Sequence, residues 1–168
     1  MMIRPPWSPA VLLLALLAAG CGLECSEVGC GGGLGVQIST PDGAWPEGTY
    51  TLTLTADGQT STCTLALDTP LAPSDSRNFT CDRDTSAALS NERRSDEDGD
   101  VITNDLVPGR YRLTTGLPTQ PDRVQVTLQR DDRTLLQGEA TPDYEENEIN
   151  GPGCGVCRQG AVTLAAGA

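Results

Sequence analysis

Cysteine is the residue type in this chain whose spacing offers the most chemistry. Seven cysteines occur among the 168 residues. Cys154 and Cys157 form a C-x-x-C pair, which is the spacing of thiol–disulfide oxidoreductases. Those enzymes activate the first thiolate at a helix N-terminus, whereas Gly-Pro-Gly precedes this pair and a β-like segment follows it. An envelope thiol–disulfide enzyme is therefore an alternative, not the favoured hypothesis.

Zinc and structural disulfides are the other two interpretations of the cysteines. Cys25 and Cys30, together with the C-x-x-C pair, could supply four thiolates, as structural zinc sites do. Disulfide formation competes with zinc binding outside the cytoplasm, so we favour three disulfides. In this hypothesis Cys63 pairs with Cys81, and Cys25 and Cys30 pair with Cys154 and Cys157 in an order that the sequence leaves open.

Three carboxylates at alternate positions, Asp96, Asp98 and Asp100, could supply oxygen ligands to calcium. An EF-hand loop has glycine at position six and glutamate at position twelve, whereas this segment has Gly99 at position four and Val107 at position twelve. We favour a solvated turn without metal, and keep a calcium-dependent adhesion module as an alternative. No other cofactor is expected.

The chain has no histidine, and all eleven basic residues are arginine. Catalysis by Ser-His-Asp or Cys-His groups needs an imidazole, and Schiff-base chemistry needs a lysine. Metal sites with histidine ligands are excluded because the chain has no histidine. We therefore expect a protein without enzymatic activity and assign no catalytic residue.

The N-terminal segment has the pattern of a secretory signal. Arg4 precedes the apolar run 11–19, and the small residue Gly20 and then Cys21 follow it. The run is shorter than the roughly 20 apolar residues that a membrane-spanning helix needs. Residues 11–21 resemble the lipobox of bacterial lipoprotein precursors. The resemblance implies cleavage after Gly20 and attachment of diacylglyceryl and N-acyl chains to Cys21. The alternative is a conventional signal peptide cut near Ala19, with Cys21 as one half of a disulfide.

Lipidation of Cys21 would determine where the protein is located and how many cysteines remain for disulfides. Two or three acyl chains hold a protein at a membrane almost permanently. Gly22 stands where an aspartate commonly directs retention at the inner membrane, so we expect the outer membrane. Lipidated Cys21 leaves six cysteines, an even number for disulfides. The net charge of −12 repels phosphate backbones, so we expect no nucleic-acid partner.

Alternation of apolar and polar residues predicts an all-β fold. Tyr50–Ala56 and Thr62–Leu67 alternate strictly, and Asp57-Gly58 between them is a hairpin signal. Seven or eight short strands indicate a disulfide-bonded antiparallel β-sandwich, immunoglobulin-like or transthyretin-like, with a small barrel as the alternative. The remaining segments with strand character are 35–40, 79–81, 101–103, 110–114, 123–130, 133–140 and 158–164.

The predicted organisation has three parts: a cleaved signal peptide at 1–20, a Gly/Cys-rich tether at 21–34, and a single β-sandwich domain at 35–168. Within the domain, Asp82–Asp100 is polar and is expected to hold at most one helical turn. Pro142–Gly155 is expected to be an acidic loop. Trp45 lies in a turn-rich loop, where it either covers the sandwich or stacks on a sugar or a partner, and we favour the cover.

The lipobox, the stretch Pro41–Cys63 and the tail Asn150–Leu164 resemble small bacterial lipoproteins with a cysteine-stapled β-domain. This resemblance implies no activity. We expect a lipid-anchored envelope protein that binds or scaffolds another envelope protein or an extracellular polymer. Binding commonly resides on loops, and the expected surfaces are Asp82–Asp105 and Pro142–Gly155.

Overall fold

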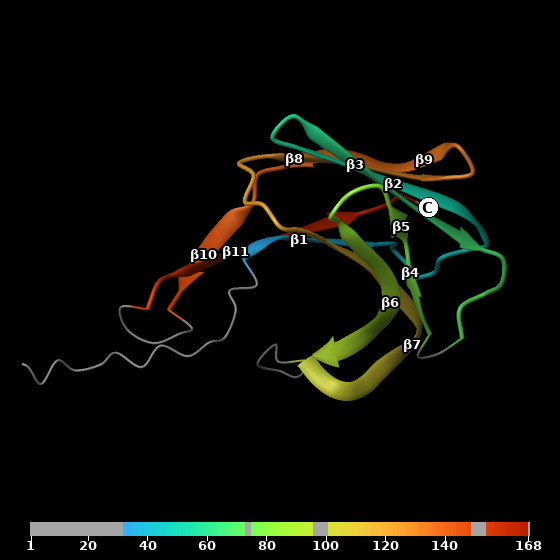
Figure 1. Cartoon of the computed structure of the whole chain (residues 1–168). Coiled ribbons are helices and arrows are strands. Elements are labelled where there is room, and N and C mark those ends of the chain that lie inside the picture. Colours follow the sequence, from blue (N-terminus) through green and yellow to red (C-terminus); the bar gives the residue numbers. More distant parts are fainter. Residues whose placement is uncertain (1–31, 73–74, 96–100, 149–153, 168) are drawn as a thin grey trace, which may run out of the picture.

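The computed structural model describes residues 32–72, 75–95, 101–148 and 154–167. Two β-sheets pack face to face, and no helix occurs in these ranges (Figure 1). The all-β sandwich expected from the sequence is therefore confirmed. A helix that could cross a bilayer is correspondingly absent from the described ranges.

The described residues form eleven strands, whereas seven or eight were expected. They are β1 (Gly33–Ser39), β2 (Gly48–Ala56), β3 (Gln59–Leu67), β4 (Ser76–Asn78), β5 (Thr80–Cys81), β6 (Ser86–Ser95), β7 (Val101–Leu117), β8 (Val124–Arg130), β9 (Arg133–Ala140), β10 (Asp143–Asn147) and β11 (Cys157–Ala165). Sheet A has the order β10-β11-β1-β7-β6-β4, and sheet B has the order β5-β3-β2-β8-β9. All pairs are antiparallel except β1 with β11. In immunoglobulin constant domains the second and third strands lie in different sheets, whereas here β2 and β3 form one hairpin.

The core lies between the sheets and follows the period-two pattern of the strands. Tyr50, Leu52 and Leu54 on β2 are fully buried, and the threonines between them are half-exposed. Strands β3, β8 and β1 repeat this alternation with Leu, Val and Ile facing inward. Because a one-residue slip would turn every such side chain to solvent, the pattern also fixes the register.

Two expectations about irregular segments are wrong. Asp82–Asp100 contains a ten-residue strand, β6, where at most one helical turn was expected. Its inward positions are Ala87, Leu89 and Asn91, and pairing with the long strand β7 holds it extended. The expected acidic loop Pro142–Gly155 begins with strand β10, which pairs with the edge of β11. Both segments become strands through pairing with the strand that follows them in the chain.

Strands β6 and β7 form a hairpin that bends away from the sandwich (Figure 1). The β6–β7 register shifts between Asn91 and Arg93 and again between Arg93 and Ser95. Gly109, directly after Pro108, has a φ of 72°, a left-handed conformation that side chains disfavour. Such irregularities bend a strand and increase its twist, which accounts for the curl.

The chain changes sheets at Phe79. Strand β4 pairs with β6 in sheet A, and β5, which follows immediately, pairs with β3 in sheet B. Phe79 is buried between them, and its backbone N–H donates to the carbonyl of Ala87 (2.8 Å). This crossing therefore lies beside the first residues of β6.

Candidate functional site

The predicted disulfide between Cys63 and Cys81 is present. It joins opposite positions on β3 and β5, and Cys63 is fully buried in the core. Since β5 has only two residues, this covalent bond fastens the short strand to sheet B. The role is structural.

Cys154 and Cys157 are both disulfide-bonded. Cys157 is buried at the start of β11, so a strand follows the C-x-x-C pair and no helix is there to activate a thiolate. Cys25 and Cys30, the partners proposed from the sequence, lie outside the described residues. Their pairing with this end of β11 stays a prediction.

Several other predicted residues also lie outside the described ranges. Cys21, the predicted lipid attachment site, is one, and the candidate calcium ligands Asp96, Asp98 and Asp100 are the others. Among the residues that are described, no group of three or more acidic or cysteine side chains is arranged to hold a metal ion.

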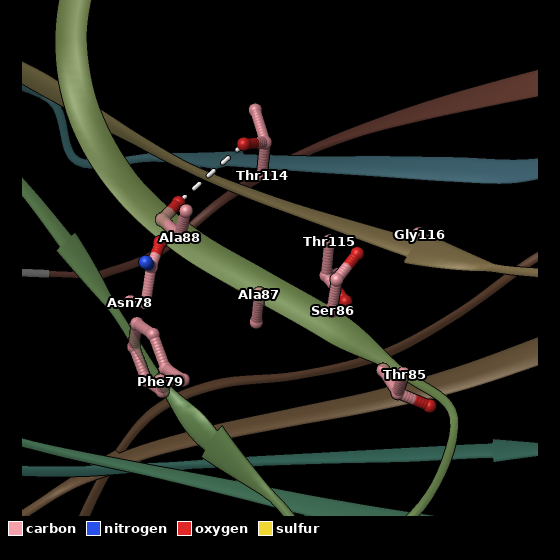
Figure 2. Close-up of a pocket in the computed structure, with 9 residues that line it drawn as sticks. All are labelled: Asn78, Phe79, Thr85, Ser86, Ala87, Ala88, Thr114, Thr115 and Gly116. Atoms are coloured by element: carbon pink, nitrogen blue, oxygen red, sulfur yellow. Dashed lines mark hydrogen bonds between the residues drawn. The ribbon is translucent and has the colours of Figure 1, made fainter.

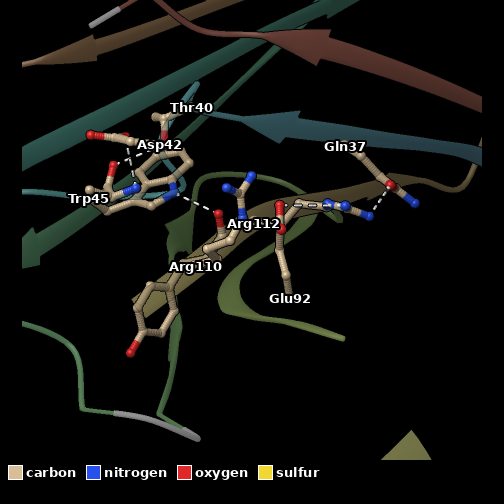
Figure 3. Close-up of polar contacts among 9 residues, drawn as sticks. Gln37, Thr40, Asp42, Trp45, Glu92, Arg110 and Arg112 are labelled. Carbon is tan, nitrogen blue, oxygen red and sulfur yellow. Dashed lines mark hydrogen bonds and ion pairs between the residues drawn. The ribbon is translucent and has the colours of Figure 1, made fainter. Parts of the chain in front are cut away.

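Trp45 is buried, with 6 % of its surface exposed, as expected for a residue that covers the sandwich (Figure 3). Its Nε1–H donates to the carbonyl oxygen of Tyr111 (3.0 Å), and its ring centroid lies 5.3 Å from that of Tyr50. Asp42 accepts a hydrogen bond from the Ala44 N–H and shapes the loop that carries the tryptophan. The indole face is therefore part of the core and is not available to stack on a sugar.

A charged network that the sequence did not reveal lies on the outer face of sheet A (Figure 3). The Glu92 carboxylate contacts Arg110 at 3.0 Å and Arg112 at 3.5 Å, and Arg112 also donates to Gln37 (3.0 Å). Glu92 is 11 % exposed, but both arginine side chains are more than one-third exposed. Because both arginine side chains are partly exposed to solvent, these ion pairs add little to stability.

A hollow of about 550 Å³ lies beside the first residues of β6 and is also lined by Phe79, where the chain changes sheets (Figure 2). Phe79 and Ala87 contribute apolar surface, and the polar groups are hydroxyls and one amide. None of the lining side chains is charged: Asn78, Phe79, Thr85, Ser86, Ala87, Ala88, Thr114, Thr115 and Gly116. Thr115 is 5 % exposed, and its hydroxyl has no hydrogen-bond partner. Thr115 lies on the core-facing side of β7 with Tyr111 and Leu113, so this hydroxyl belongs to the core and does not face outward with Ser86 and Gly116. Ligands usually bind in concave surfaces, so the hollow is a candidate site.

A second hollow of about 480 Å³ adjoins the first and shares Ser86 and Gly116 with it. It extends over the start of β1, where Gly35 lines it. Ser86, Gly116 and Gly35 are cross-strand neighbours on β6, β7 and β1, and they face away from the core. We call the two hollows and this row of three residues the cross-strand groove.

No family model, curated protein or solved structure matches this chain.

The cross-strand groove was not predicted from the sequence. The two expected binding surfaces included Ser86, but as part of a loop and without its neighbours on β7 and β1. One local signal was present, because a glycine inside a strand pattern, such as Gly35 between Leu34 and Val36, often marks the close approach of a ligand or another chain.

Proposed function

We propose that this protein is a lipid-anchored component of the bacterial cell envelope whose β-sandwich is a non-enzymatic binding or scaffolding domain. The observation that carries the proposal is the run 11–19 followed by Gly20 and Cys21, which has the form of a lipobox. Cys21 would carry the acyl chains and hold the domain at the membrane, which we propose to be the outer membrane.

The fold supports an N-terminal attachment. Strand β1 begins at Gly33, and Gly33 lies opposite Gln159 on β11, close to the disulfide-bonded Cys157. The chain thus enters the sandwich beside a disulfide-bonded cysteine. Because β1 is an interior strand of sheet A, paired on both sides, a tether there would hold the whole sheet.

Metabolic labelling with a radioactive fatty acid tests the anchor. The wild-type protein should take up label, Cys21→Ala should take up none, and the control Cys25→Ala should be labelled as strongly as wild type. Undiminished label in Cys21→Ala would contradict the proposal. Membrane fractionation tests the location, because Gly22→Asp should move the protein from the outer to the inner membrane.

A further inference from the structure

We propose that two copies of this protein associate through the outer face of sheet B. This inference rests on the proposed scaffolding function and names the partner as a second copy of the chain. It is carried by the residue types on that face, by the position of the charges around it and by its area.

Opposed threonines form the centre of this face. Strand β2 is the middle strand of sheet B, and its outward side chains alternate with the buried core residues. Three of these outward residues lie directly opposite a threonine of β3. The pairs are Thr51 with Thr64, Thr53 with Thr62, and Thr55 with Thr60. We call the outer side of sheet B around these six residues the threonine face.

The threonine face continues onto β8 without charge. Gln125, Thr127 and Gln129 lie beside the three threonines of β2 and face the same side. Charge appears at the edge of the sheet, where Glu139 on β9 pairs with Arg123. The outer face of sheet A, by contrast, carries the charged network described above. A centre depleted of charge within a polar rim is the composition of a protein–protein interface.

A second copy is the partner that this charge distribution favours. The chain has a net charge of −12, so two copies repel each other wherever acidic surfaces meet. The threonine face lets them approach without placing like charges in contact. Its methyl groups supply apolar area. The Thr55 and Thr60 hydroxyls already bond to each other across the strands (3.0 Å), which lowers the cost of removing water from them.

The area is that of a weak, reversible dimer. Four strands about 4.8 Å apart, over the seven positions that pair β2 with β8, give a face of roughly 450 Å². Two such faces bury about 900 Å², close to the roughly 1,000 Å² that a specific interface needs. A two-fold axis along the strands keeps both Gly33 ends on the same side, so two copies anchored in one membrane could pair. Anchoring would also raise their effective concentration.

Analytical ultracentrifugation of the full-length protein in detergent, over a series of protein concentrations, tests the proposal. The wild-type protein should shift from monomer to dimer as its concentration rises. A chain that stays monomeric up to about 1 mM would overturn the proposal, whatever other ligand the threonine face bound.

Charge variants locate the contact. Thr53→Glu places like charges at the centre of the face and should weaken dimerisation about tenfold or more. Thr163→Glu is the matched control, because Thr163 is an exposed threonine on β11 of sheet A, and it should dimerise as wild type does. Any pairing caused by shared detergent micelles would be the same in both variants.

A mixture of opposite charges separates the contact from folding. Thr53→Arg alone should also dimerise less than wild type, whereas an equimolar mixture of Thr53→Arg and Thr53→Glu should form heterodimers. The proposal is overturned if Thr53→Glu dimerises as wild type, or if the mixture associates no more than either variant alone. Fatty-acid labelling of Cys21 is independent of these results, so failure of the anchor and failure of the dimer are distinguishable.

Discussion

At the level of single residues, the hydroxyl of Thr115 is buried and unsatisfied, so removing it should stabilise the protein. Thr115→Val keeps the shape of the side chain and should raise the free energy of unfolding by about 1 kcal/mol. Thr114→Val is the matched control, because the Thr114 hydroxyl donates to the Ala88 carbonyl and its loss should not stabilise. Chemical denaturation measures both. A loss of stability in Thr115→Val would show that the hydroxyl is already satisfied.

Asp82 is the residue from which we predict acid sensitivity. The Thr62 backbone N–H donates to its carboxylate (2.9 Å), and this bond, aided by the Ser61 hydroxyl, lowers the pKa of Asp82 below 3.8. A lowered folded-state pKa gives stability that is present above pH 3.8 and is lost as the pH falls further. Asp82→Asn should therefore be less stable than wild type at pH 6, and the difference should shrink below pH 3.8. The prediction would be contradicted if the difference in melting temperature between Asp82→Asn and wild type stayed the same across this pH range.

At the level of elements, two hairpin turns with the same backbone geometry differ in one residue. Asp57-Gly58 and Asp131-Asp132 both have positive φ at both positions, as type I′ turns require. Aspartate at the second position is strained where glycine is not. Asp132→Gly should raise the free energy of unfolding by about 0.5–1 kcal/mol, and Gly58→Asp should lower it by a similar amount. Urea unfolding measures both free energies. If both substitutions stabilised the protein, or both destabilised it, the prediction would be wrong.

The Cys63–Cys81 disulfide should contribute measurably to stability. It closes a sequence separation of 18 residues, and replacing both cysteines by alanine should cost about 3 kcal/mol in the loop-entropy model. Hydrogen exchange should speed up first in β5 and around Phe79, because the bond fastens that crossing to sheet B. Uniformly faster exchange across both sheets would contradict this local role.

The sequence predicted the elements whose own residues alternate and missed those whose strand conformation depends on pairing with a neighbouring strand. Tyr50–Ala56 carries its period-two pattern locally, so β2 and its hairpin were predictable. Strand β10 has a single large apolar residue, Tyr144, and becomes a strand because it pairs with β11. The cross-strand groove was harder to predict than these strands, because only the sheet register places Gly35 beside Gly116.

At the level of the whole molecule, the C-terminus joins the two sheets. The Ala166 N–H donates to Ser39 on β1, and the Gly167 N–H donates to Leu135 on β9. Ala166 is also buried. Deleting residues 166–168 should cost about 2 kcal/mol, from two hydrogen bonds and the lost burial. Thermal unfolding measures the loss.

The parallel pairing of β1 with β11 has a mechanical consequence. The chain enters β1 at Gly33 and leaves β11 beyond Ala165, so the two ends of the polypeptide depart from opposite ends of one strand pair. A pull between them loads the seven paired positions in shear, and the bonds must rupture together instead of unzipping one by one. Such geometry resists force along the axis on which a surface-tethered domain would be stretched.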